Sequence, residues 1–393
     1  MMLRRILILA LMLCLIALPA SAARYDLEDG RFIVVALGGV YGYARAADGT
    51  IYTWGDNQFG QLGRGYTSQE FSVNLPSVLK SRNTEMDLSR VKDIIATSNY
   101  NLLWMEDDTL YGAGSNGFLS LGPNEGTFAA HQRLPKLPEK PAAIETGFGQ
   151  VLMLTENGQV YAWGRNTKGE VGNGGTRNVG EPYRLPLENI VQICCGGHFS
   201  LALDGDGTLW GWGNNEYHVL SAGPESFFIA PIRIDTGDIR IASMAAGGYT
   251  VSLLDEDGAV WTWGRNDLYQ LGYETSGAFS ATPRKVDLPL PVTSLALYNA
   301  MCYAILEDGS LWSWGNNGNG QLGRGMSSTG KGMPGQCVAA DVVLVASGSL
   351  FAVCVLRDGT VLCAGANNHY ELGTPESVNS TKMTPNGLDL IPD

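Results

Sequence analysis

A short motif recurs seven times along this chain: Trp-Gly or Ala-Gly, followed two residues later by Asn. Successive copies lie about 50 residues apart, a period typical of repeat proteins in which one unit cannot bury its apolar face alone. The motif glycines are Gly55, Gly114, Gly164, Gly213, Gly264, Gly315 and Gly365.

Each repeat also predicts a tight hairpin. Asp-Gly or Asn-Gly stands six or seven residues before the motif glycine in every unit except one, which has Asp107-Asp108. Such dipeptides between apolar runs favour hairpin turns, because they supply positive φ at little cost. The flanking runs, such as residues 151–154 and 160–163, are apolar with little alternation, which is typical of strands covered on both faces. Sheets stacked in this way are the blades of a β-propeller.

Other aligned positions indicate structural roles. Eight of the nine Trp residues lie one or three residues before a motif glycine, a regularity that favours packing between blades over a ligand cage. An Asn side chain can shape a loop by bonding to nearby backbone. The motif Asn residues are Asn57, Asn116, Asn166, Asn215, Asn266, Asn317 and Asn367. An aliphatic anchor follows five residues after each of them.

The best unit, residues 196–215, reads Gly-Gly-x-x-Ser-Leu-Ala-Leu-x-x-Asp-Gly-x-Leu-x-x-Trp-Gly-x-Asn, and Gly-Gln-Leu-Gly follows the motif in other units, as at residues 60–63. This pattern resembles the repeat of the regulator of chromosome condensation family. The resemblance implies an all-β, seven-bladed β-propeller with roughly four-stranded antiparallel blades. The family's functions include nucleotide exchange on the GTPase Ran, chromatin binding, light sensing and, in secreted bacterial members, inhibition of β-lactamases. Fold does not choose among them.

The N-terminus predicts export. Two arginines precede a thirteen-residue apolar stretch, residues 6–18, and a small-x-small site ends at Ala22. This is the pattern of a secretory signal peptide, so we expect residues 1–22 to be removed, with an uncleaved anchor as the alternative. The propeller would then span residues 23–393 of a secreted protein that resembles the bacterial members and has no membrane span.

The charge of the chain disfavours nucleic acid as a partner. The full chain carries 26 basic and 39 acidic residues, a net charge of −13. Cleavage after Ala22 would remove only Arg4 and Arg5 and make the balance more acidic. An acidic surface repels phosphate backbones and anionic membranes, and it suits a partner with a basic face.

Six cysteines follow the leader, and one disulfide can be argued from spacing. A two-residue turn at Asp358-Gly359 would place Cys354 opposite Cys363, whereas a three-residue loop would shift the register and leave two buried thiols. No His, Cys and Glu spacing suggests a metal site, and no phosphate loop or nucleophile elbow is visible. We therefore expect neither cofactor, metal nor catalysis.

The positions that vary between repeats indicate where a partner could bind. Four residues after each motif glycine, a loop of common geometry presents a different side chain, and rigid loop aromatics are preferred interface anchors. These candidates are Phe59, Phe118, Lys168, Tyr217, Leu268, Asn319 and His369, with His218, Tyr269 and Tyr370 next to three of them. Alternatively, single members fold down over the blade edge. An insertion at residues 65–89, with Tyr66 and Phe71, is a further candidate.

Three functional hypotheses follow. The first is a secreted, monomeric, non-catalytic module that binds a protein partner, for instance as an inhibitor of an exported enzyme. The second is a carbohydrate-binding or cell-surface structural propeller, for which exposed loop Trp residues would be expected. The third, implied by the resemblance alone, is guanine-nucleotide exchange, which export disfavours.

Overall fold

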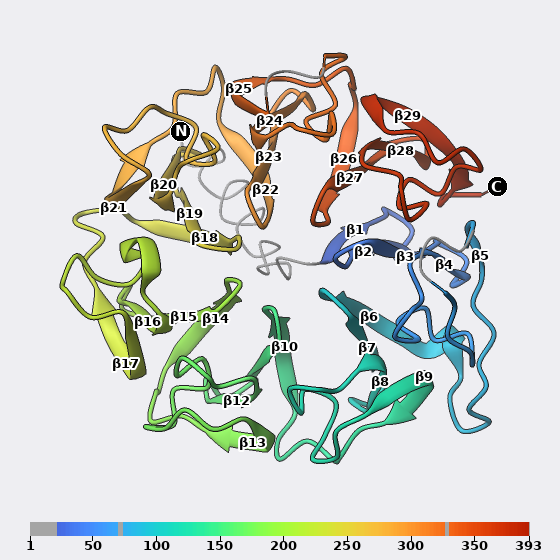
Figure 1. The fold of residues 1–393 in the computed structure, drawn as a ribbon, viewed down its shortest axis with the longest axis horizontal. Helices are drawn as coiled ribbons and strands as arrows, with labels where there is room; N and C mark the ends of the chain where they lie inside the picture. The colour runs from blue at the N-terminus through green and yellow to red at the C-terminus, as the bar shows by residue number, and fades with distance from the viewer. Residues whose placement is uncertain (1–21, 70–73, 327–329, 393) are drawn as a thin grey trace.

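The computed structural model describes residues 22–69, 74–326 and 330–392. Within them the chain forms seven antiparallel sheets arranged as a ring around a central axis, with the first blade beside the last (Figure 1). This confirms the all-β, seven-bladed propeller. The expected leader, residues 1–22, lies outside the described residues except for Ala22, and so does Phe71.

In each blade the strands follow one another from the axis to the rim. Blade 1 has β1 (Ala22–Asp26), β2 (Phe32–Leu37), β3 (Tyr41–Arg45), β4 (Ile51–Gly55) and β5 (Ser77–Val78). Blade 2 has β6 (Val91–Ala96), β7 (Tyr100–Met105), β8 (Leu110–Ser115) and β9 (Thr127–Arg133). Blade 3 has β10 (Pro141–Thr146), β11 (Gln150–Thr155), β12 (Val160–Gly164) and β13 (Val179–Arg184). Blade 4 has β14 (Ile190–Cys195), β15 (Phe199–Asp204), β16 (Leu209–Asn214) and β17 (Phe227–Ile234).

The last three blades have the same plan. Blade 5 has β18 (Ile241–Ala246), β19 (Thr250–Asp255), β20 (Val260–Arg265) and β21 (Phe279–Lys285). Blade 6 has β22 (Val292–Tyr298), β23 (Met301–Leu306), β24 (Leu311–Asn316) and β25 (Lys331–Gln336). Blade 7 has β26 (Val342–Ser347), β27 (Phe351–Leu356), β28 (Thr360–Gly365) and β29 (Ser380–Asp389). Two short 3-10 helices, η1 (Leu88–Arg90) and η2 (Glu216–His218), lie in connections.

The motif glycine is the last or next-to-last residue of its strand in every blade (β4, β8, β12, β16, β20, β24 and β28), and Gly55 shows why no other residue serves there. Gly55 pairs with Tyr41 and has a φ of +92°. A Cβ atom on Gly55 would lie 2.8 Å from the Cα atom of Tyr41. Glycine therefore provides both the left-handed backbone and the close approach of the two strands.

The motif Asn is buried, and its side chain holds the following loop through hydrogen bonds to the backbone. In blade 3, Asn166 Oδ1 accepts a hydrogen bond from the backbone N–H of Val171 at 2.9 Å, and Asn166 Nδ2 donates to Gly175 O and Arg177 O. The same bond to the aliphatic anchor recurs in every blade. The predicted structural role of the Asn is therefore confirmed.

The core lies between blades, and the motif Trp joins them. Each of the seven hydrophobic clusters combines residues of two adjacent blades. Trp263 of blade 5 is buried, and its Nε1 donates to Val219 O of blade 4 at 2.9 Å. Four other motif Trp residues make the equivalent bond to the preceding blade around the ring. This packing confirms the structural interpretation of these rings.

Blade 2 has Ala113 in place of the Trp, and other side chains fill the gap. Asn101 Nδ2 donates to Gln61 O, the carbonyl that a Trp would reach, and Asn101 Oδ1 lies 2.9 Å from His131 Nε2. His131 is 2% exposed and is therefore part of the packed interior rather than a surface or loop residue. Burial lowers the pKa of His131 to about 3.

The Cys354–Cys363 disulfide expected from a two-residue turn does not form. The hairpin has a three-residue loop, 357–359, which pairs Cys354 with Leu362 and Cys363 with Val353. Side chains of paired strands alternate between faces, so the two cysteines pack into clusters on opposite sides of blade 7. All six described cysteines are buried free thiols.

Candidate protein-binding surface

The strand connections distinguish the two ends of the propeller. In blades 2 to 7, one end carries the turns between first and second strands and the loops that the motif Asn holds after the third strands; we call it the loop end. The other end carries the tight hairpins between second and third strands and the links between blades; we call it the hairpin end. Blade 1 follows the same plan when counted from β2, and the candidate residues of the aligned loops all belong to the loop end.

Buried polar side chains fix the candidate loops. The backbone N–H of Lys168 donates to Glu170 Oε2 at 2.6 Å, and Glu170 is fully buried. Phe59 N donates to Gln61 Oε1 at 2.8 Å in the same way. Equivalent bonds to Gln or Glu hold the backbones of Leu268, Asn319 and His369. Five of the seven candidate loops are therefore held by a buried side chain below them, whereas Ser120 and Val219 occupy the equivalent position in the loops of Phe118 and Tyr217.

The predicted ring separates into exposed members and members that fold against the next blade. Phe59 and Phe118 are 38% and 39% exposed, and Lys168 is also exposed. Tyr217, Leu268, Asn319 and His369 are half-buried. The neighbouring His218, Tyr269 and Tyr370 are half-buried too, and the His218 ring lies 4.9 Å from that of Phe279 in blade 5.

His218, Tyr269 and Tyr370 occupy a loop position whose left-handed backbone conformation is unfavourable for bulky residues. In every blade the residue five after the motif glycine has a positive φ, and three blades place Gly there: Gly60, Gly169 and Gly320. The other four place Leu119 (φ 64°), His218 (φ 56°), Tyr269 (φ 61°) and Tyr370 (φ 61°). A bulky residue in this region costs roughly 1–3 kcal/mol, and such strain is commonly found at functional sites.

The structure adds a cluster of rings that the sequence analysis did not single out. The ring centroids of Tyr217 and Tyr249 are 5.3 Å apart, and those of Tyr249 and His198 are 5.8 Å apart. The series continues toward the axis through Phe148, 5.4 Å from His198, to Tyr298. A signal was present for two of them: Phe148 occupies a turn position that the other blades fill with Gly, Ser or Asn, and Tyr298 occupies one that they fill with Gly or Thr.

Two arginines cover the aromatic cluster. Arg165 lies over the Phe118 ring, with 4.9 Å from its guanidinium carbon to the ring centroid. Arg265 lies over the Tyr217 ring at 5.2 Å. Each arginine stands directly after a motif glycine and reaches the loop of the preceding blade. Blades 2 to 5 thus present alternating aromatic and cationic groups, the composition found at the centre of protein interfaces.

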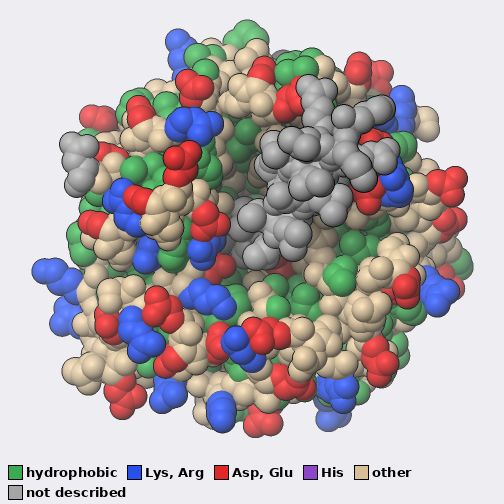
Figure 2. Space-filling model, turned by 180° about the vertical axis from the view of Figure 1, so that it is seen from behind, with side chains coloured by type: hydrophobic (Ala, Val, Ile, Leu, Met, Phe, Trp, Pro, Cys, Tyr) green, Lys and Arg blue, Asp and Glu red, His purple; other side chains and the backbone are tan. Residues whose placement is uncertain are grey.

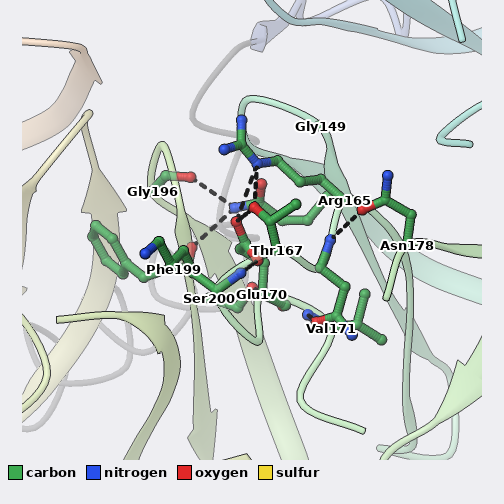
Figure 3. Close-up of polar contacts among 12 residues, drawn as sticks. Gly149, Arg165, Thr167, Glu170, Val171, Asn178, Gly196, Phe199 and Ser200 are labelled. Carbon is green, nitrogen blue, oxygen red and sulfur yellow. Dashed lines mark hydrogen bonds and ion pairs between the residues drawn. The ribbon is translucent and has the colours of Figure 1, made fainter. Parts of the chain in front are cut away.

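Arg165 is held from below by a buried carboxylate. Its Nε donates to Thr167 Oγ1 at 3.1 Å and lies 3.2 Å from Glu170 Oε1 (Figure 3). No hydrogen bond joins the terminal nitrogens of Arg165 to another residue in the part of the chain that the structure describes. Burial and the charge of Arg165 lower the pKa of His198 to about 4, so this histidine is neutral near pH 7.

Among the described residues no group of three or more His, Cys, Asp or Glu side chains could hold a metal ion. No helix in the described ranges is long and apolar enough to cross a membrane. On the face turned away from the viewer of Figure 1, acidic and basic side chains are interspersed (Figure 2).

The fold and the repeats assign the chain to a protein family. Residues 17–336 match the family model of the RCC1-like domain, and residues 342–371 match that of the regulator of chromosome condensation (RCC1) repeat. This chain therefore belongs to the RCC1-like propeller family, which confirms the resemblance found in the sequence.

Several proteins share the sequence pattern. The chain is 27% identical over 330 residues to the mitochondrial RCC1 domain-containing protein RUG3 of Arabidopsis thaliana, with 78% of this chain and 70% of that protein covered. It is 28% identical over 347 residues to the human E3 ubiquitin-protein ligase HERC2, covering 83% of this chain but 7% of that protein. Both are eukaryotic, so they give no support to a bacterial, secreted origin.

Solved structures show the same fold. Prp20p from Saccharomyces cerevisiae superposes with a TM-score of 0.77 at 19% identity, covering 90% of this chain and 87% of that one. Human WBSCR16 superposes with a TM-score of 0.73 at 23% identity, covering 82% and 87%.

Proposed function

We propose that this chain is a non-catalytic, protein-binding propeller that captures its partner on the loop end. The observation that carries the proposal is the aromatic and cationic surface formed by Phe118, Arg165, Tyr217, Tyr249 and Arg265 on adjacent blades. Aromatic and Arg side chains on rigid supports are the residues most often responsible for binding energy at interfaces.

Two further observations support protein binding. Four blades keep a bulky residue at a strained position where three others use glycine, and such strain is common at functional sites. Relatives with this fold also bind proteins: Prp20p binds Gsp1p and histones. Because the identity to Prp20p is 19%, its partners are not transferred to this chain.

We propose that the protein acts outside the cytosol, because residues 1–22 have the pattern of a signal peptide. Cleavage after Ala22 would leave Ala23 as the first residue, still within β1. The partner would then be an exported protein, and inhibition of an exported enzyme is a concrete form of this function. Mass spectrometry of the protein recovered from its native host's extracytoplasmic fraction tests the point: a chain that begins at Met1 contradicts cleavage.

The binding surface is tested by paired variants of the mature protein used as bait. Phe59, Phe118, Tyr217 and Tyr370 changed together to Ala should abolish capture of the partner that wild type retains, while the melting temperature stays nearly unchanged. Glu156→Ala, exposed and paired with Lys140 at the hairpin end, is the control and should capture normally. A folded quadruple variant that keeps the partner would move the site elsewhere.

The opposite result is expected for a motif Trp. Trp263→Ala removes a ring that is 1% exposed and its bond to Val219 O, so it should lower the free energy of unfolding by about 3–5 kcal/mol. Its partner capture at low temperature should persist. Urea titration of the two proteins separates the stability effect from the binding effect; unfolding of the quadruple loop variant would instead show that its aromatics are core.

A further inference from the structure

A cleft opens at the hairpin end between blades 4 and 5, far along the strands from the loop end. It has a volume of about 480 Å³ and is bordered by the link from β17 to β18, the hairpin after β19, and two residues of β21. Its aromatic wall is Trp261, which is half-buried and whose Nε1 donates to Asp255 Oδ2 at 2.8 Å.

The charge of the cleft is strongly negative. Five carboxylates border it: Asp235, Asp238, Asp255, Glu256 and Asp257. The one basic residue of the lining, Arg240, is already paired, with its Nη1 2.9 Å from Glu256 Oε2 and its Nη2 3.6 Å from Asp257 Oδ2. Asp235 and Asp238 are exposed on the link, so their charge faces the opening.

The equivalent site in blade 4 already holds a cation of the chain itself. Trp210 occupies the position of Trp261, and its Nε1 donates to Asp204 Oδ2 at 3.0 Å. The guanidinium carbon of Arg233 lies 5.2 Å from the Trp210 ring centroid. In blade 2, Trp104 lies at a different position, on β7, but it also donates to a carboxylate, Asp108 Oδ1, and has Lys92 Nζ 3.7 Å from its ring centroid.

Trp261 is different. Lys285 is its cross-strand neighbour, as Arg233 is that of Trp210, but Lys285 is exposed and no basic side chain in the described parts of the chain lies over the Trp261 ring. We propose that this cleft binds a guanidinium or ammonium group from a basic segment of a partner protein, stacked on Trp261 and surrounded by the carboxylates. The proposal is independent of the loop-end surface, because neither the residues nor the end of the propeller is shared.

The physical basis is the attraction of a cation to the face of an indole ring, strengthened by carboxylates in a concave site. Such a contact contributes roughly 0.5–2 kcal/mol, or up to about thirtyfold in affinity. The neighbouring charges add an attraction that falls as salt rises. Binding should therefore weaken with ionic strength and depend on Trp261.

The test uses the mature full-length protein and an acetylated, amidated pentapeptide of alternating glycine and arginine. Calorimetric titration at low salt should give saturable binding that Trp261→Leu weakens about tenfold and Asp238→Asn weakens severalfold. Arg240→Ala should strengthen it, because this change removes the competing cation of the cleft. A peptide with citrulline in place of arginine should not bind.

Trp312 of blade 6 provides the matched control. It occupies the same strand position, is half-buried as well, and has Leu306 where Trp261 has its Asp partner. Trp312→Leu should leave peptide binding within about twofold. Equal losses in Trp312→Leu and Trp261→Leu, or undiminished binding of the citrulline peptide, would overturn the proposal. If Trp261→Leu does not fold, the other two variants provide the test. Weaker peptide binding by Asp238→Asn together with stronger binding by Arg240→Ala supports the proposal, and any other combination overturns it.

Discussion

At the scale of single residues, the motif Asn gives the most direct test of the repeat. Asn166 is fully buried, and its side chain bonds one backbone N–H and several loop acceptors. Asn166→Ala should lower the free energy of unfolding by about 1–3 kcal/mol, because these groups lose their partners in a buried site. Thr176→Ala, exposed in the same loop, should change it by less than about 0.5 kcal/mol. Chemical denaturation measures both, and equal values would refute the structural role.

His131 makes stability depend on pH. Its pKa falls from 6.5 in the unfolded chain to about 3 in the folded one, since burial beside Asn101 disfavours the charged ring. The unfolded chain therefore binds more protons between these values, and stability must decrease as pH falls from about 6.5 toward 3. The slope from this group approaches 1.4 kcal/mol per pH unit. His131→Gln should flatten the dependence of unfolding free energy on pH; an unchanged profile would assign acid sensitivity to other groups.

At the scale of strands and loops, the repeat made most of the blade predictable from sequence. The motif Asn recurs in all seven units, the turn glycine in six and the Trp before the motif glycine in five, so one chain supplies its own comparison. The length of a hairpin loop could not be predicted by comparing the repeats. Asp358-Gly359 is compatible with a two-residue or a three-residue loop, and only the backbone bond from Gly359 N to Leu356 O decides for the longer one.

The loop-end cluster was predictable only in part for a related reason. Phe118 and Tyr217 stand in aligned loops, so their common geometry could be inferred from the Asn and its anchor. The contact between Tyr217 and Tyr249 joins two blades, and its distance depends on how neighbouring sheets are rotated. No periodicity within one blade encodes that rotation. For the same reason the sequence did not reveal Arg165 and Arg265 as part of this surface, since each guanidinium lies over a ring of the preceding blade.

The innermost strand β1 is an element that the repeat does not contain, and it should stabilise the closed ring. It pairs with β2 along its whole length and contacts β26 of the last blade. Ala23 and Tyr25 pack against the cluster shared by blades 1 and 7, and the Arg24 guanidinium lies 3.8 Å from the Phe32 ring centroid. Deletion of residues 23–27 should lower the melting temperature by several degrees, measured by calorimetry, with loop-end partner capture retained. An unchanged transition would show that β1 is an accessory strand.

At the scale of the whole molecule, the first and last blades meet without sharing a strand. A closed ring can place residues 31–36 and 388–391 in separate first and last blades or in one shared blade, and the first arrangement is observed. β2 lies in blade 1 and β29 in blade 7, so each blade is built from one continuous segment. The seam is closed instead by contacts between complete blades, chiefly the cluster that Ile33, Trp54 and Phe351 share.

The C-terminal residues connect the two sides of this seam, so truncation tests closure. Leu390 is fully buried, its N–H donates to Gly359 O, and its carbonyl accepts from Ala47 N of blade 1 at 2.8 Å. Deleting residues 383–393 removes these bonds and most of β29, and it leaves a long exposed edge on β28. We expect a clearly lower melting temperature and self-association in light scattering. Deleting only residues 392–393 should change neither, because Leu390 stays in place. If the longer truncation melts like the intact protein, closure of the ring does not depend on this seam.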